Sequence, residues 1–332
     1  MDRTSTLSGF VAGWSGRRVT VLGDLVADVT LMGTTSRISR EAPVLVVLEQ
    51  KKLVYPGGGA NVVANLRALG AVPLPVGIVG RDEPGQGLIE NLQSRGIPCE
   101  GVISDPLRFT TTKTRIFAGG HNTVRQQMLR LDRVNRAAVT GQVLEALKAA
   151  LRRCVAESGA LLVSDYGEGV VHPSLREEVC ELARQGVPVF VDSRFAIHQF
   201  FGVTALTPNE PELAEVSHSD LSAELALDEA GQWLLQQTRC ESLLVKRGRN
   251  GMALFLAGKP VVKIPAYGTV EVADVTGAGD TVLASFSLAR IAGASAEQAM
   301  HIANTAGGIK VTKSGTAVVS ADELCSALEK LP

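Results

Sequence analysis

The segment at residues 274–281 (DVTGAGDT) places small residues and a carboxylate at the expected start of a helix. Gly277, Ala278 and Gly279 leave backbone N–H groups open to a ligand, which predicts an anion site. Asp280 would repel phosphate, so its carboxylate is better suited to act as a general base that takes a proton from a hydroxyl. The alternative is a tight turn in which Asp280 is only a favourable charge at a helix N-terminus.

Two segments carry residue types suited to a hydroxylated ligand. The run at 56–61 (PGGGAN) lets a ligand approach the backbone, and Asn61 offers both a donor and an acceptor. The run at 23–28 (GDLVAD) follows the first expected strand, where Asp24 or Asp28 could accept hydrogen bonds from sugar hydroxyls. The alternatives are a loop that caps a helix for the first run and a capped turn for the second.

Two later segments carry charges suited to a nucleotide and its metal ion. The run at 207–212 (TPNEPE) has carboxylates that could hold hydrated Mg²⁺, while Asn209 is equally suited to be a helix N-cap. The run at 246–251 (KRGRNG) could bring cations and glycines to a phosphate, but a solvated hairpin turn explains it as well. The segment lacks a G-x-x-x-x-G-K-[ST] pattern, as does the rest of the chain, so no P-loop is predicted.

Apolar strands alternate with helical patterns around these segments, which predicts an α/β fold with a mostly parallel sheet covered on both faces. The expected strands are 18–23, 74–79, 160–164, 187–191, 203–206, 243–246 and 252–256. The expected helices are 60–69, 85–95, 141–156, 173–184, 277–292, 296–311 and 321–330.

Two segments, about 29–54 and 110–131, instead alternate with period two and are rich in Thr, Val, Arg and Gln. They predict antiparallel strands inserted into the α/β unit, which meet as one small sheet. Such a sheet at the edge of the fold is a candidate lid or subunit interface, or a stabilising flap. Residues 1–332, with these inserted segments, are expected to form a single domain.

Composition narrows the possible partners. With 33 Lys plus Arg, 34 Asp plus Glu and 4% aromatic residues, the chain is not predicted to bind nucleic acid. No apolar run is long enough to span a membrane, and the N-terminus does not resemble a signal peptide. Five scattered cysteines without a C-x-x-C pattern indicate reduced thiols, so a cytoplasmic protein is expected.

Taken together, these segments resemble the ribokinase or PfkB family of carbohydrate kinases from Val19 to about Leu328. The first family signature is 57–61 followed by Gly70 and Gly80, and the second runs from Asp274 to Ala284. The resemblance implies a ribokinase-like fold with a small β-sheet lid, and transfer of a phosphoryl group from ATP to a sugar hydroxyl. It also implies Mg²⁺ and often a monovalent cation such as K⁺, and a homodimer formed through the lid.

The resemblance also assigns roles to residues. Asp280 would be the catalytic base, with Gly277, Ala278 and Gly279 as the anion hole. The implied sugar contacts are Asp28, Gly58 and Asn61, and the nucleotide side would hold Asn209, Glu212, Lys246, Gly248, Gly251 and Asn304. Glu212 would hold Mg²⁺ through water, and Asp274 and Thr276 match the monovalent-cation positions.

Within the family, the chain looks most like the kinases of D-glycero-β-D-manno-heptose 7-phosphate, which phosphorylate the anomeric hydroxyl. The supporting residues are 35–44 (TSRISREAPV), Ser164, Asp165, Tyr166, Gln126, Gln127, Arg130 and Asp132. A phosphosugar needs cations, for which the candidates are Lys113, Arg115, Arg130 and Arg194. Many such kinases are fused to a nucleotidyltransferase; only the kinase part is expected here.

The sequence departs from the family pattern at several positions. Val63 and Ser285 replace small residues, and Lys246 replaces a Thr before the nucleotide glycines. At 192–195 the chain reads DSRF where heptose kinases typically read DPKG, and Arg is not a neutral exchange for Lys at a phosphate site. These departures leave two alternatives open: a kinase of another sugar, sugar phosphate or nucleoside, and a catalytically silent sugar- or nucleotide-binding regulator.

Overall fold

The fold is built on a nine-stranded sheet with the strand order β13-β12-β11-β10-β9-β8-β1-β4-β5. The computed structural model describes residues 3–120, 124–221, 223–268 and 273–331. All strand pairs from β5 to β11 are parallel, and β12 and β13 add an antiparallel edge. The strands are β1 (Arg18–Gly23), β4 (Val72–Gly80), β5 (Val102–Asp105), β8 (Leu161–Asp165), β9 (Val189–Ser193), β10 (Ala205–Leu206), β11 (Ser242–Lys246), β12 (Met252–Leu256) and β13 (Val262–Ile264).

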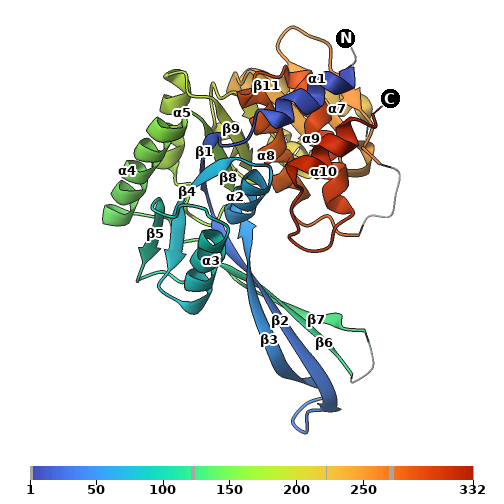
Figure 1. Cartoon of the computed structure of the whole chain (residues 1–332). Coiled ribbons are helices and arrows are strands. Elements are labelled where there is room, and N and C mark those ends of the chain that lie inside the picture. The colour runs from blue at the N-terminus through green and yellow to red at the C-terminus, as the bar shows by residue number, and fades with distance from the viewer. Residues whose placement is uncertain (1–2, 121–123, 222, 269–272, 332) are drawn as a thin grey trace.

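Helices cover both faces of this sheet, as the apolar strands predict (Figure 1). Neighbouring strand residues point to opposite sides: Leu162 packs in one core, while Leu161 and Val163 pack in the other. The helices of the first core are α1 (Arg3–Ala12), α2 (Gly59–Ala68), α3 (Glu83–Ser94), α8 (Ala278–Ile291), α9 (Ala296–Val311) and α10 (Ala321–Leu328). Those of the second are α4 (Gly141–Ser158), α5 (Pro173–Arg184), α6 (Glu210–Ser217) and α7 (Glu224–Thr238).

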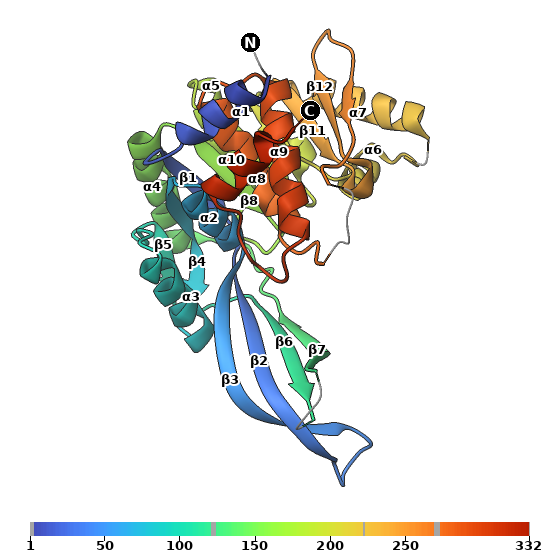
Figure 2. The same cartoon turned by 45° about the vertical axis from the view of Figure 1, so that its right-hand side comes forward.

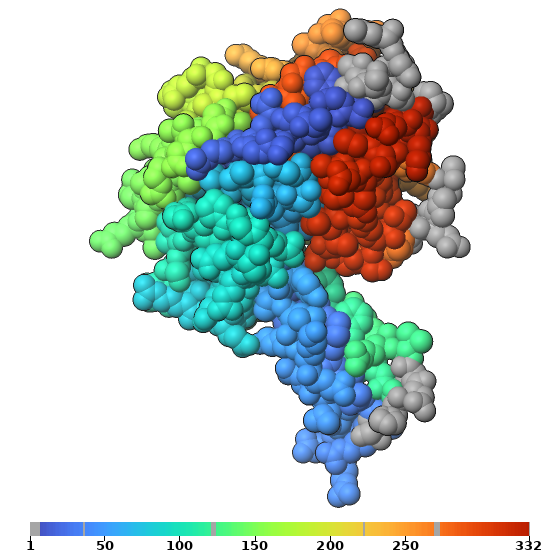
Figure 3. Space-filling view, in the orientation of Figure 1, coloured from blue at the N-terminus to red at the C-terminus, as the bar shows by residue number. Residues whose placement is uncertain are grey.

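A second, four-stranded sheet, here called the small sheet, stands away from this body (Figures 2 and 3). Its order is β3-β2-β6-β7, from β2 (Leu25–Ile38), β3 (Leu45–Gly58), β6 (Thr112–Gly119) and β7 (Gln126–Arg133). The two segments expected to meet do so, although residues 121–123 of the second lie outside the described residues. One expectation was wrong: β2 and β6 pair in parallel, because both strands leave the body in the same direction.

The expected elements are otherwise present with shifts of a few residues at their ends. The sequence reading missed α1, β5, α6, α7 and β13, which are short, edge or polar elements with weak periodicity. Within the described ranges, no helix combines the length and the apolar character that crossing a membrane requires.

Candidate active site

The candidate site lies where parallel strands end and α8 begins. Loops at the carboxyl ends of such strands converge on one edge of a sheet, which is where open α/β folds bind their ligands. In this chain those loops follow β1, β8, β9, β10 and β11. They bring together residues more than 200 positions apart, including the two glycine-rich segments.

Asp280 is the centre of the site. It lies in the first turn of α8 and is 4% exposed. Asn61 Nδ2 donates a hydrogen bond to Asp280 Oδ2 at 2.6 Å, and the Tyr166 hydroxyl donates to Oδ1 at 3.0 Å. Burial is the main cause that raises the pKa of Asp280 to about 6, and the Asn61 and Tyr166 hydrogen bonds act to lower it. A carboxyl with this pKa is ionised near neutral pH and basic enough to accept a hydroxyl proton.

The turn before Asp280 is closely packed and contains two glycines, Gly277 and Gly279. Gly277 has φ 75°, and a Cβ there would lie 2.5 Å from Asn61 Nδ2. A Cβ on Gly279 would lie 3.4 Å from Lys246 Nζ. The amide of Ala278 donates to Val275 O at 3.2 Å, so its part in the anion hole differs from that expected. The amides of Gly279 and Asp280 follow in the first helical turn, where no intrahelical acceptor exists.

Helices α2 and α8, which follow the two glycine-rich segments, are held side by side by hydrogen bonds. Besides the Asn61–Asp280 contact, Thr281 Oγ1 donates to Asn65 Oδ1 at 2.8 Å, one helical turn further along α2. Gly58, at the start of α2, has φ 54°, and a Cβ there would lie 2.7 Å from Asp24 O. The backbone conformation of the glycines before α2 therefore fixes the position of Asn61 next to Asp280.

A partly buried lysine borders the turn formed by residues 277–279, here called the anion turn. Lys246 ends β11, and its Nζ donates to Asp192 Oδ2 at 2.6 Å. Burial alone would lower the pKa of Lys246, but the carboxylates of Asp192 and Glu212 raise it above its usual value. The ammonium is therefore charged and lies beside Gly279.

Asn209 and Glu212 form the N-terminal cap of α6. Asn209 Oδ1 accepts from Glu212 N, and Glu212 Oε2 accepts from Asn209 N, both at 2.8 Å. The N-cap alternative for Asn209 is thus confirmed. Burial, and next the charge of Asp192, raise the pKa of Glu212, so this carboxyl also lies close to the anion turn.

Mg²⁺ can be held by this side of the site. Mg²⁺ usually takes one or two carboxylates, with phosphate oxygens and water completing its shell. Asp192 and Glu212 match that requirement. Among the residues that the structure describes, no group of three or more His, Cys, Asp or Glu side chains could enclose a metal ion.

The residues expected to contact the sugar include Asp28, at the base of the small sheet. Asp28 is 5% exposed, and its Oδ1 lies 3.2 Å from Arg115 Nη1. A Cβ on Gly57 would lie 2.9 Å from Asp28 Cγ, so only glycine permits this approach. Burial raises the pKa of Asp28, and the charges of Arg115, Lys113 and Arg130 act against that rise.

Three cations of β6 and β7 thus surround one buried carboxylate. Lys113 is the cross-strand partner of Asp28, and its Nζ lies 4.9 Å from the centre of the Tyr166 ring. Arg130, the cross-strand partner of Arg115, makes two hydrogen bonds to Asp132 at 2.7 and 2.8 Å. Arg194 is elsewhere: it stacks on Phe195, and its charge lowers the pKa of Glu212.

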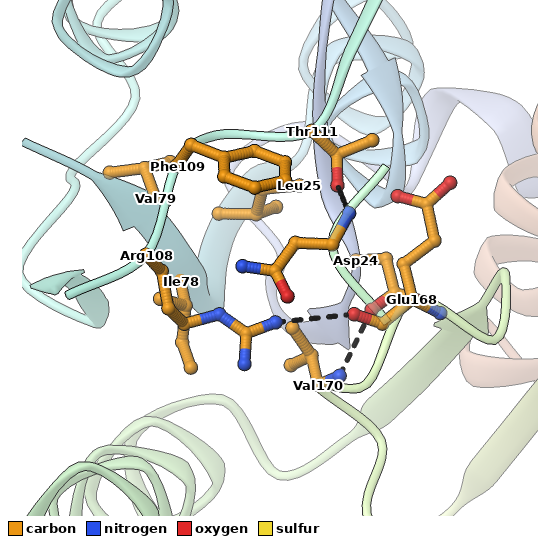
Figure 4. Close-up of a pocket in the computed structure, with 10 residues that line it drawn as sticks. Asp24, Leu25, Ile78, Val79, Arg108, Phe109, Thr111, Glu168 and Val170 are labelled. Carbon is orange, nitrogen blue, oxygen red and sulfur yellow. Dashed lines mark hydrogen bonds between the residues drawn. The ribbon is translucent and has the colours of Figure 1, made fainter. Parts of the chain in front are cut away.

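Asp24, the other candidate for the sugar, has a different task. Its carboxylate accepts hydrogen bonds from the backbone N–H groups of Tyr166, Glu168 and Val170 at 2.8, 3.1 and 3.2 Å. Burial, reinforced by Asp165, raises the pKa of Asp24 to about 7. Figure 4 shows Asp24 beside Glu168 and Arg108 at the wall of a small cavity under the small sheet. Asp24 therefore holds the loop that presents Tyr166.

The remaining expected residues lie in the β11–β12 turn, on α9 and before α8. Gly248 and Gly251 have φ 55° and 84° in the turn between β11 and β12, as the hairpin alternative predicts. Asn304, on α9, donates to Pro265 O at 2.8 Å. Asp274 Oδ1 accepts from Thr276 N at 2.8 Å, which ties these two residues to each other.

The sequence did not reveal two groups that act on Asp280, one by a hydrogen bond and one through its charge. Tyr166 was noted only as part of a family resemblance, and its hydrogen bond to Asp280 was not expected. Lys310, a fully buried lysine at the end of α9, was read only as part of a helix. A charged residue at an apolar helical position is the signal that could have revealed Lys310.

Comparisons with known proteins agree with this geometry. A bifunctional protein HldE from Desulfatibacillum aliphaticivorans is 37% identical over all of this chain and 67% of its own length. One from Caulobacter vibrioides is 39% identical over 94% of this chain and 63% of its own length. The chain thus spans about two thirds of the length of these curated relatives.

Solved structures show the same fold. Arabidopsis thaliana ribokinase, complexed with ribose and ATP, superposes with a TM-score of 0.72 at 20% identity, covering 96% of this chain and 100% of that one. Escherichia coli phosphofructokinase-2 superposes with a TM-score of 0.75 at 18% identity, covering 94% and 98%. The family model of the pfkB carbohydrate kinases matches residues 17–323. With its ribokinase-like fold and its glycine-framed Asp280, the chain belongs to the pfkB family of carbohydrate kinases.

Proposed function

We propose that this kinase transfers the γ-phosphoryl group of ATP to the anomeric hydroxyl of D-glycero-β-D-manno-heptose 7-phosphate. The observation that carries the substrate proposal is the group of three cations, Lys113, Arg115 and Arg130, around Asp28. A neutral sugar needs hydroxyl partners, whereas a phosphosugar also needs cations to replace the hydration of its phosphate. Similarity to HldE over the whole chain supports the same assignment.

In this proposal Asp28 and Asn61 hold sugar hydroxyls, and Asp280 takes the proton of the attacking hydroxyl. The amides at the start of α8 and the ammonium of Lys246 stabilise charge on the transferred phosphoryl group. Glu212 would hold Mg²⁺ through the water shell of the ion, and the bound ion would supply positive charge to the ATP phosphates. Gly248, Gly251 and Asn304 border the nucleotide.

The small sheet, from segments 29–54 and 110–131, acts as a lid that keeps water from ATP. The described part of this sheet exposes several large apolar side chains, which supports its pairing with a second copy in a homodimer. These residues are Ile38, Leu45, Leu48, Leu129 and Leu131. A cytoplasmic location follows from the need for ATP, and we take the whole chain as one kinase domain.

A second candidate is a kinase of another phosphosugar. The observation that favours it is Arg194, which stacks on Phe195 where the heptose kinases typically carry Lys and Gly. The cation cluster at Asp28 serves this candidate equally well. A silent binding protein has no need of an ionised Asp280 with two hydrogen-bond donors.

The test is ADP release from Mg²⁺–ATP with heptose 7-phosphate, fructose 6-phosphate, ribose, fructose and adenosine. We expect turnover with heptose 7-phosphate at least tenfold above the other sugars. Turnover with a different phosphosugar supports the second candidate. A response to neutral ribose or fructose alone contradicts the role given to the three cations, and no turnover with any member contradicts the kinase proposal.

A further inference from the structure

Lys310 is a lysine with no exposed surface, in the last turn of α9. Lysine is almost never fully buried unless other groups compensate its charge. Its Nζ donates to Gly315 O at 2.9 Å and to Lys313 O at 3.4 Å, both in the loop that follows α9. The ammonium is therefore held by backbone carbonyl oxygens.

This loop also contacts the segment that leads to the anion turn. Gly315 N donates to Asp274 Oδ2 at 2.9 Å, and Ala273 N and Asp274 N both donate to Val311 O. Although partial burial acts to raise the pKa of Asp274, hydrogen bonds from Thr276 and Gly315 lower it, so the carboxyl is ionised. Gly315 thus links the Lys310 ammonium, through its carbonyl, to the Asp274 carboxylate, through its amide.

The charges of the site act on Lys310 as well. Burial lowers the pKa of Lys310, and Lys313 does the same, but the carboxylates of Asp274 and Asp280 raise it. The ammonium consequently lies within the electrostatic field of the catalytic base. It adds positive potential behind the turn that receives the phosphoryl charge.

Carbonyl oxygens and a nearby carboxylate are also the ligands by which proteins replace the hydration shell of K⁺. The chain was expected to hold such a cation at Asp274 and Thr276. Asp274 does not fit that role, because both of its carboxylate oxygens already accept hydrogen bonds from backbone N–H groups and the carbonyl oxygens of Lys313 and Gly315 accept from Lys310.

We infer that the Lys310 ammonium is a built-in monovalent cation, and that this kinase needs neither K⁺ nor Na⁺. Lys310 is a positioning residue: it fixes the 313–315 loop against Asp274 and so sets the conformation of the anion turn. The catalytic consequence rests on the kinase activity proposed above, but not on the identity of the sugar. The structural consequence can be measured without any substrate.

The first experiment measures thermal unfolding of the wild type and of Lys310→Ala in 100 mM KCl and in 100 mM tetramethylammonium chloride. The wild-type midpoint should differ by less than about 1 °C between the salts. In Lys310→Ala the carbonyls and Asp274 are left without a cation, so K⁺ should raise its midpoint by roughly 2 °C or more. A K⁺-stabilised wild type, or a variant that does not respond to K⁺, would overturn the inference.

The second experiment measures ADP release in the same salts, with the sugar identified by the substrate panel. Wild-type kcat should change by less than twofold, whereas K⁺ should restore at least fivefold activity to Lys310→Ala. Lys313→Met is the matched control, since its ammonium donates to Val318 O and Glu323 at the surface. It should show no K⁺ response. Wild-type stimulation by K⁺ of fivefold or more contradicts the inference. A kinase inactive with all sugars, yet with the expected unfolding results, refutes only the proposed function.

Discussion

Removing the Tyr166 hydroxyl should weaken catalysis only on the acidic side of the pH profile. This hydroxyl donates to Asp280 Oδ1 at 3.0 Å, and it lowers the pKa of a carboxyl that burial has raised to about 6. Asp280 acts as a base when ionised, so activity falls as pH decreases through its pKa. In Tyr166→Phe the carboxylate loses one donor, its pKa rises, and the fall begins at higher pH.

The size of the shift can be worked from this contact. A hydrogen bond to a charged group contributes about 1.5–3 kcal/mol, and one pKa unit corresponds to about 1.4 kcal/mol. The acidic limb should therefore move up by about one to two units. At pH 6 the variant should retain between about a sixth and about a seventieth of wild-type kcat/KM, and by pH 9 it should recover most of it.

The assay is kcat/KM for the sugar from pH 5 to 9, since this ratio reports ionisation in the free enzyme. Tyr267→Phe is the matched control, because the Tyr267 ring packs near Gly308 on α9 rather than against the base. Its acidic limb should stay in place. An unshifted limb in Tyr166→Phe, or an equal loss of activity at every pH, would show that Tyr166 does not tune Asp280.

Three further substitutions test the remaining groups. Asp280→Asn should lose about 10²–10⁴-fold in kcat. The pKa of Asp280 is raised in the folded state, so ionisation of this carboxyl destabilises the fold above pH 6. The thermal unfolding midpoint of Asp280→Asn at pH 8 should therefore be at least as high as that of the wild type. A lower midpoint contradicts this reasoning. Lys246→Met should lower kcat at least tenfold, because it removes a positive charge beside Gly279 and leaves Asp192 without its ion-pair partner. Lys259→Met is the surface control. An unchanged kcat in Lys246→Met excludes Lys246 from the phosphoryl site. Lys113→Met should raise KM for a phosphosugar several-fold more than KM for its unphosphorylated form, and equal changes would contradict a phosphate contact.

Much of the fold was predictable because its signals are local. Apolar runs such as 160–164 and 252–256 identify buried strands whatever surrounds them, and capping residues and Pro mark helix starts such as that of α5. The glycine-rich turn before Asp280 is also a local signal. Weakly periodic elements such as α6, and the parallel pairing of β2 with β6, depend on tertiary contacts that no short window contains.

The site was less predictable for the same reason. The type of residue at 61 and 280 suggested chemistry, but the 2.6 Å contact between them depends on two helices packing side by side. Asp24 and Asp28 looked equivalent as carboxylates after a strand. In the structure, three backbone amides donate hydrogen bonds to Asp24, and these amides belong to the loop after β8.

One residue, Asp24, separates β1 of the body from β2 of the small sheet. Asp24 also holds the loop that carries Tyr166, because its carboxylate accepts a hydrogen bond from Tyr166 N. If the small sheet moves as the proposed lid, a movement that breaks this bond would free Tyr166 from Asp280 and raise the pKa of the Asp280 carboxyl. The proposed base would then be protonated when the lid is open and would not activate a water molecule against ATP. In this proposal the chain connection at Asp24 alone links the position of the lid to the ionisation of Asp280, and no separate sugar-binding element is needed for that link.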